Sequence, residues 1–142
     1  MIYSKLKTRI KKNEGFSKHP YKDQLGKLTI GYGHLITKKD KFFINKKPST
    51  AELDRVFEKD FNVAAELYKR KFFKRSHSKK EKELLIEMIF QLGWRGVLKF
   101  KKMLFHINKK NKHLTCLEML DSLWYKQTPK RVEKLLKHYL KQ

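Results

Sequence analysis

The sequence is short of cysteine and has no long hydrophobic run. Cys116 is the single cysteine, which excludes a disulfide framework and a cysteine-based metal site. Synthesis in a reducing cytoplasm is the simplest interpretation. No run approaches about 18 apolar residues, so no helix is expected to span a membrane. Residues 1–15 are basic but lack the apolar h-region of a secretory signal, so no signal peptide is predicted.

Acidic residues are scarce as well. The chain has 14 Asp and Glu against 36 Lys and Arg, which gives a net charge of +22, and the basic residues are spread along the whole chain. Such a charge favours association with a polyanion, either nucleic acid or an anionic cell wall. Lysine is also an ordinary solvent-exposed residue and far outnumbers arginine here. The charge alone therefore does not name the partner.

The length and the apolar patterns predict one domain with an α+β fold. The 142 residues, 39% of them hydrophobic, are enough for a buried core. We expect a short amphipathic helix over residues 3–12 and a small antiparallel sheet within residues 20–35, with a third strand near Phe42–Ile44. About five helices are expected to follow.

Local capping signals predict where several of these helices begin. Capping-box spacing occurs at Ser49/Glu52 before a long apolar stripe that ends near Tyr68, at Ser78/Glu81 before a helix that ends near Gly93, and at Thr115/Glu118. A short helix is expected over residues 99–107. Thr128-Pro129 predicts the start of the last helix.

Two acidic residues and a threonine lie among glycines near the N-terminus. Glu14 and Asp23 are the only acids in residues 1–39, and Thr29 follows on the expected return strand. Two carboxylates are what glycoside hydrolysis requires, one to protonate the leaving oxygen and one to activate water. The alternative is that Asp23 stabilises a turn and Glu14 faces solvent. The spacing alone favours that alternative.

The longer motif around Glu14 and Asp23 favours a catalytic role for these two acids over a structural one. Glu14, Asp23 and Thr29 are followed directly by Ile-Gly-Tyr-Gly-His, and EGFSKHPYKDQLGKLTIGYGHLITK resembles the catalytic hairpin of the T-even-type phage lysozymes of glycoside hydrolase family 24. Three further blocks resemble that family in the same order: FEKDFNVAAEL, MIFQLGWRGVLKF and LWYKQTPKRVEKL. The resemblance thus covers most of the chain.

The resemblance implies a lysozyme-like fold and activity. A β-containing lobe would cover residues 13–50, an inter-lobe helix residues 50–70, and a helical lobe residues 71–142 together with helix 3–12. The enzyme would be a muramidase that cleaves the β-1,4 bond between N-acetylmuramic acid and N-acetylglucosamine and needs no cofactor or metal. Peptidoglycan would be its partner, with no specific nucleic acid and no stable membrane insertion, and the chain would be a monomer.

The resemblance also assigns roles to single residues. Glu14 would donate the proton, Asp23 would be the second carboxylate, and Thr29 would hold the attacking water in an inverting reaction. His34 would pair with Asp60, which should raise the pKa of His34, and Arg131 would lie near the acid. The substrate-binding set would be Leu35, Phe90, Gln91, Met103, Glu118 and Trp124.

The sequence departs from the family pattern in the expected substrate cleft. Met103 and Glu118 stand where relatives have polar sugar contacts. The segment formed by residues 39–47 is shorter than the corresponding segment of the T-even type. Subsite preference therefore stays open.

Other interpretations also remain. One alternative is a basic nucleic-acid-binding protein, although the sequence shows no recognisable recognition-helix motif. The other is an inactive wall-binding module of the same fold. If the chain acts in phage lysis, synthesis in the bacterial host's cytoplasm and release by a holin would be expected.

Overall fold

The computed structural model describes residues 3–141 and divides them between two compact units. Of the described residues, the first unit comprises 3–63 and the second 64–141, with the boundary inside the long helix α2 (Thr50–Lys71). Sequence reasoning grouped helix 3–12 with the later helices, whereas this division places α1 (Ser4–Glu14) in the first unit. Lys7 and Lys11 of α1 form ion pairs with Glu58 and Asp54 of α2, at 2.7 and 3.6 Å.

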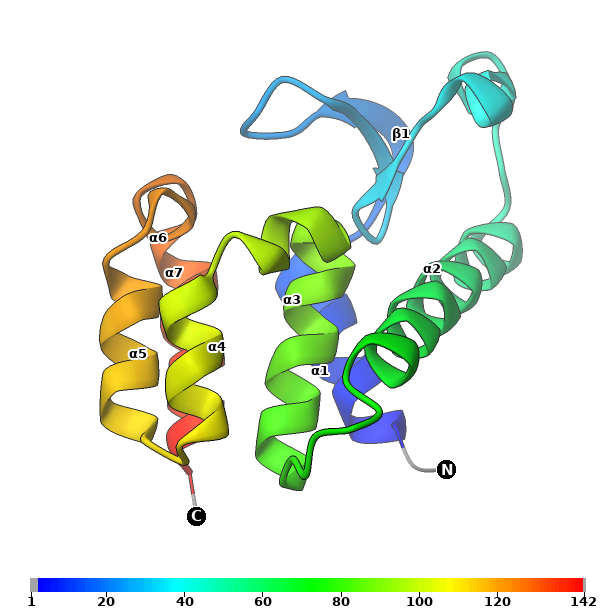
Figure 1. The fold of residues 1–142 in the computed structure, drawn as a ribbon. Coiled ribbons are helices and arrows are strands. Elements are labelled where there is room, and N and C mark those ends of the chain that lie inside the picture. The colour runs from blue at the N-terminus through cyan, green and yellow to red at the C-terminus, as the bar shows by residue number, and fades with distance from the viewer. Residues whose placement is uncertain (1–2, 142) are drawn as a thin grey trace. The chain divides into compact units, whose positions relative to one another are not determined.

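The first unit contains the predicted small sheet. β1 (Ser17–Lys22), β2 (Leu28–Gly31) and β3 (His34–Leu35) form an antiparallel sheet in the order β1-β2-β3 (Figure 1). Thr29 of β2 is paired with Tyr21 on one side and with Leu35 on the other. The sheet, together with the helices, confirms the α+β class.

The third strand is not where we expected it. Residues 42–44 belong to a 3-10 helix, η1 (Lys38–Ile44), and the third strand is β3. Phe43 of η1 is buried in a cluster with Ile30 of β2 and Leu53 of α2. Thr37 and Asp40 form a capping box at the start of η1, and this local signal together with the burial of Phe43 outweighs the β propensity of the run.

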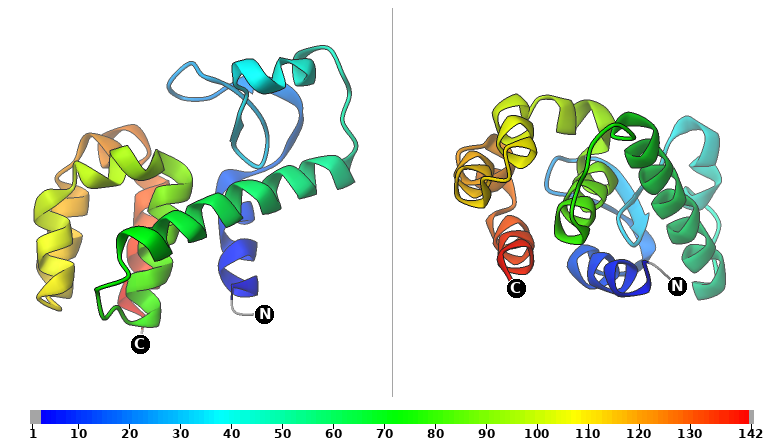
Figure 2. Two further views of the ribbon diagram at one scale, coloured as in Figure 1. Left: turned by 45° about the vertical axis from the view of Figure 1, so that its right-hand side comes forward. Right: turned by 60° about the horizontal axis from the view of Figure 1, so that its bottom comes forward.

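The second unit is helical throughout. It comprises the end of α2, α3 (Lys79–Leu98), α4 (Lys101–Asn108), α5 (Lys112–Leu120), α6 (Leu123–Gln127) and α7 (Pro129–Leu140). α4 and α5 lie side by side, as both views of the ribbon show (Figure 2). No helix within residues 3–141 is long and apolar enough to cross a membrane.

Two of the three predicted capping boxes occur. At the start of α2, the expected hydrogen bonds join the side chain of each residue of the pair Ser49/Glu52 to the backbone N–H of the other. The pair Ser78/Glu81 forms the same bonds at the start of α3. The third prediction is wrong: Thr115 lies inside α5 with 0% exposure, and its hydroxyl donates to the carbonyl of Asn111. Asn111 is the actual N-cap of α5, accepting from Leu114 N at 3.0 Å.

Candidate active site

Glu14 is the last residue of α1, and its carboxylate lies against the turn between β2 and β3. A Cβ added to Gly33 would be 2.0 Å from Glu14 Oε2 and 2.7 Å from its Cδ, so only a glycine lets the Glu14 carboxylate occupy this position. Gly33 also has φ +75°, a conformation that L residues with a side chain rarely adopt. The glycine of the Tyr-Gly-His segment therefore determines where the Glu14 carboxylate lies.

Asp23 follows β1 and organises the turn at the other end of β2. Its Oδ1 accepts hydrogen bonds from the N–H groups of Leu25 and Lys27, both at 2.9 Å. Its backbone N–H donates to the Lys27 carbonyl, also at 2.9 Å. These are the turn-stabilising bonds that the alternative interpretation proposed. They use one carboxylate oxygen, so Oδ2 takes no part in them and the turn role does not preclude a second one.

Thr29 lies on β2, between the two turns, and is 3% exposed. Its hydroxyl donates to the Lys27 carbonyl at 2.9 Å. With its proton used in this way, the hydroxyl oxygen offers its lone pairs to a donor such as water. With its hydroxyl in this orientation, Thr29 can hold a nucleophilic water by accepting a hydrogen bond from it.

Tyr21 is a residue of this region that sequence reasoning missed. It is the strand partner of Thr29 and lies two residues before Asp23. Partial burial raises the pKa of the Tyr21 hydroxyl, and the negative charges of Glu14 and Asp23 raise it further. Tyr21 thus lies within electrostatic reach of both carboxylates. The period-two position of Tyr21 opposite Thr29 was the available signal.

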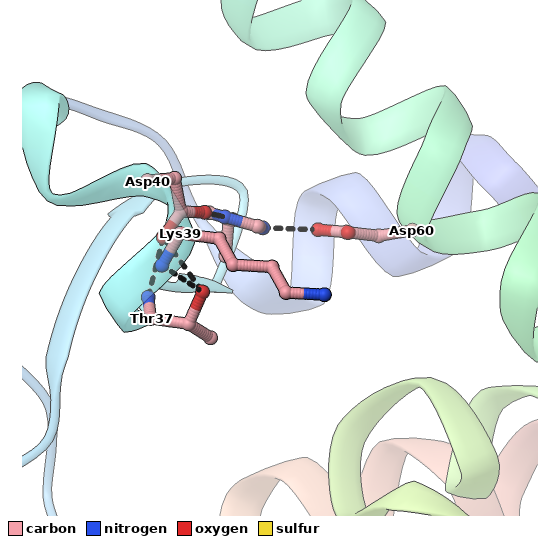
Figure 3. Close-up of polar contacts among 5 residues, drawn as sticks. Thr37, Lys39, Asp40 and Asp60 are labelled. Carbon is pink, nitrogen blue, oxygen red and sulfur yellow. Dashed lines mark hydrogen bonds and ion pairs between the residues drawn. The ribbon is translucent and has the colours of Figure 1, made fainter.

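His34 on β3 is held between two carboxylates. Its Nδ1 contacts Asp60 Oδ2 at 2.7 Å, which is the predicted pair, and its Nε2 contacts Asp40 Oδ2, which was not predicted. Figure 3 shows Asp60 of α2 and Asp40 of η1 at the two ends of this contact, with Thr37 beside Asp40. Burial by itself lowers the pKa of His34, but the hydrogen bonds and charges of Asp60 and Asp40 outweigh it and raise that pKa above 6.5.

We expect this cluster to stabilise the protein most between about pH 4 and 6.5. Because the pKa of His34 is raised, its contribution is present below its unfolded pKa and is lost as the pH rises through the folded value. Burial tends to raise the pKa of Asp40, but the bonds from His34 and Thr37 lower it below 3.8. The contribution of Asp40 to the stability of the fold is therefore present above pH 3.8 and is lost as the pH falls through the lowered pKa.

The test is urea unfolding of Asp40→Asn at pH 5.5 and 8.5. Asparagine can still accept from Thr37 N, which donates to Asp40 Oδ1. The loss should be about 1.5–3 kcal/mol at pH 5.5, the range for a hydrogen bond to a charged group, and clearly smaller at pH 8.5. Asp54→Asn, which removes the carboxylate that pairs with Lys11 and interacts with Tyr32, is the control and should show no such difference between these two pH values. An equal loss for Asp40→Asn at both pH values would contradict the expectation.

The remaining predicted site residues fall into separate groups. Leu35 is exposed on β3, beside Thr29. Met103, Glu118 and Trp124 line one cavity of the second unit, and Met103 there is 0% exposed. The other members of the substrate-binding set, Phe90 and Gln91, are partly buried on α3 just before Gly93, where the helical backbone is interrupted.

Arg131, on α7, contacts the buried carboxylate of Glu87 at 3.5 Å, and its proposed relation to the catalytic acid stays a prediction. Among residues 3–141, no three His, Cys, Asp or Glu side chains come together in a way that could hold a metal ion.

Comparisons with known proteins agree with the motif. The profile of the phage lysozyme family matches residues 11–141. The chain is similar to "Probable T4-type lysozyme 2" of Dictyostelium discoideum, at 35% identity over an alignment of 158 positions that covers 95% of this chain and 93% of the relative. "Probable T4-type lysozyme 1" of the same organism is 31% identical over the same shares of both chains. The chain therefore belongs to the phage lysozyme family.

Proposed function

We propose that this chain hydrolyses the β-1,4 bond between N-acetylmuramic acid and N-acetylglucosamine in peptidoglycan, with inversion at the anomeric carbon. Its family makes it a lysozyme-type glycosidase. The observation that carries the finer proposal is the arrangement around β2. The Glu14 carboxylate lies against Gly33 at one end of this strand, Asp23 forms the turn at the other end, and Thr29 lies between them.

The positions of the two acids favour single displacement. The Glu14 carboxylate lies against Gly33, which follows β2, and Asp23 accepts from Lys27 N, which precedes β2, so the two acids are held at different ends of one strand. Inversion requires two carboxylates about 6.5–9.5 Å apart with a water molecule between them, whereas the two carboxylates of a retaining enzyme lie closer together.

The steps assign one role to each group. Glu14 gives its proton to the glycosidic oxygen as the bond between that oxygen and the anomeric carbon breaks. A water molecule that donates one hydrogen bond to the Thr29 hydroxyl oxygen attacks the anomeric carbon from the opposite face. The second proton of this water passes to Asp23. The products are a free hydroxyl on the leaving sugar and a new reducing end of inverted configuration.

Product analysis on purified peptidoglycan tests this proposal. Reducing ends should appear as turbidity falls, and NMR spectra taken before mutarotation should show the α anomer first. A β anomer as the initial product would overturn the inverting mechanism. Binding to the wall without release of reducing ends would favour the inactive module instead. Activity should also weaken with added salt, because the net charge of +22 attracts the enzyme to its anionic substrate.

Asp23→Asn separates the two roles of Asp23. Asparagine keeps an oxygen that can accept from Leu25 and Lys27, so the turn should survive and the free energy of unfolding should change by less than about 0.5 kcal/mol. The charge and the basic group are lost, so hydrolysis should fall by about 10²–10⁴-fold. Thermal unfolding and the reducing-end assay on the same preparation measure both. If the variant hydrolyses peptidoglycan normally, Asp23 is only a turn residue.

A further inference from the structure

A strongly basic segment, residues 69–80, joins the end of α2 to the start of α3 in the second unit (Figure 1). Its sequence, KRKFFKRSHSKK, contains seven Lys and Arg among twelve residues and no Asp or Glu. None of the residues assigned above to catalysis or to substrate binding lies in it. The basic segment therefore calls for an explanation other than the hydrolysis proposed above.

The charges of the basic segment are not neutralised by the fold. The exposed cations of the segment are Lys69, Arg70, Lys71, Lys74, Arg75 and Lys79. No ion pair within residues 3–141 involves any of these six side chains. Glu81, the first acid after the segment, is 3% exposed and pairs with Lys110 at 2.7 Å. Six unpaired cations in so short a stretch attract an anionic partner.

An apolar ring lies at the tip of the basic segment. The N–H of Arg75 donates to the Phe72 carbonyl at 2.9 Å and closes a turn whose two middle residues are Phe73 and Lys74. Phe73 is 73% exposed, more than any other large hydrophobic residue that the structure describes. The ammonium of Lys74 lies 5.6 Å from the centre of the Phe73 ring. The most exposed apolar side chain and the unpaired cations thus share one turn.

The turn is held in place on both sides. Before it, the Phe72 ring packs against the rings of Tyr68 and Trp94, with centroids 5.3 and 5.4 Å away. After it, the Ser76 carbonyl accepts a hydrogen bond from Lys110 Nζ at 2.5 Å. A tip that is ordered before it meets a partner loses little conformational freedom on binding.

The exposed ring distinguishes between the anionic partners that these charges attract. Binding of single-stranded nucleic acid uses several rings on which successive bases stack. In the basic segment only Phe73 is free for this, because Phe72 meets Trp94 edge-on at 83°. An anionic bilayer offers phosphates to the cations and, directly beneath them, acyl chains to a single ring. The combination therefore favours a bilayer over a nucleic acid.

We propose that the basic segment binds the surface of a membrane containing anionic phospholipids, with the Phe73 ring among the acyl chains and the surrounding cations at the phosphates. The binding is peripheral and reversible, because one ring enters the interface and no part of the segment spans it. It does not depend on the proposed hydrolysis, so failure of either proposal can be recognised separately.

Vesicle sedimentation with the intact protein tests the proposal. Phosphatidylcholine vesicles containing about 30% phosphatidylglycerol should bind the protein, and vesicles of phosphatidylcholine alone should bind it at least about ten-fold more weakly. Added salt should weaken the binding, because it screens the charges. In Phe73→Trp, brominated acyl chains should quench the fluorescence more strongly than in the wild type, which reports that this ring reaches the hydrocarbon. Absence of binding to the anionic vesicles would overturn the proposal.

Phe73→Ser isolates the contribution of the ring. It should lower the affinity for anionic vesicles by about five-fold or more. Phe42→Ser, which removes a phenylalanine that is 52% exposed on η1, is the matched control and should change the affinity by less than about two-fold. Phe73→Ser should retain wild-type hydrolysis of soluble peptidoglycan fragments. If it instead loses affinity for a single-stranded oligonucleotide and binds vesicles normally, the segment is a nucleic-acid surface and the proposal is wrong.

A second pair of variants locates the cations. Lys74→Gln/Arg75→Gln should lower the vesicle affinity by about ten-fold or more. Lys130→Gln/Lys134→Gln removes the same charge from exposed positions on α7 and should lower it by less than about three-fold. Equal weakening by both double variants would show attraction by net charge alone and would overturn the proposed surface.

Discussion

Glu14→Gln is expected to lower peptidoglycan hydrolysis by about 10²–10⁴-fold while leaving the fold intact. Glutamine has nearly the same shape, so it can lie against Gly33 as the carboxylate does. It has no acidic proton to give to the glycosidic oxygen, and the bond to the leaving sugar must then break without protonation. Initial rates of reducing-end release, measured at equal enzyme concentration, give the size of the effect.

Glu66→Gln is the matched control for this variant. Glu66 is exposed on α2, so the substitution makes the same change in net charge without touching the sheet or its turns. It should retain wild-type hydrolysis. Thermal unfolding of both variants shows whether either has lost stability. If Glu14→Gln clears bacterial walls as fast as the wild type, Glu14 is not the proton donor and the proposed mechanism is wrong.

Gly33→Ala is expected to reduce hydrolysis by at least about ten-fold through displacement of Glu14, without altering any proposed catalytic group. The new Cβ would be 2.0 Å from Glu14 Oε2, so the carboxylate has to move away. That carboxylate is the far end of a flexible side chain, so the clash itself should cost little stability. The left-handed backbone at φ +75° should cost about 1–2 kcal/mol.

Gly93→Ala separates the backbone cost from the steric effect. Gly93 also has a positive φ, +76°, with ψ 164°, a combination almost restricted to glycine, and an added Cβ there meets nothing within 4 Å. Both variants should lose stability in urea unfolding, and only Gly33→Ala should lose most of its activity. A comparable loss of activity in both would mean that backbone strain, rather than the position of Glu14, controls the rate.

Features set by neighbours in sequence could be read from the chain alone. The capping boxes at Ser49 and Ser78 depend on residues three positions apart, and the apolar stripe of α2 repeats at the helical period, so local pattern is enough to predict them. The motif that runs from Glu14 to His34 is also local, and it identified the family correctly. The third capping box failed because the position of Thr115 was decided by burial, not by spacing.

Features that depend on how the elements fold against one another required the structure. Asp40 as the second partner of His34, the charges of both acids near Tyr21, and η1 in place of a strand could not be predicted from residue spacing. The same holds for the glycine at position 33, whose importance lies in a contact with Glu14, nineteen residues earlier in the chain. The site residues could thus be recognised from a local motif, whereas their positions in space depend on how the elements pack. Packing energy depends on shape and burial, and no short window of sequence contains that information.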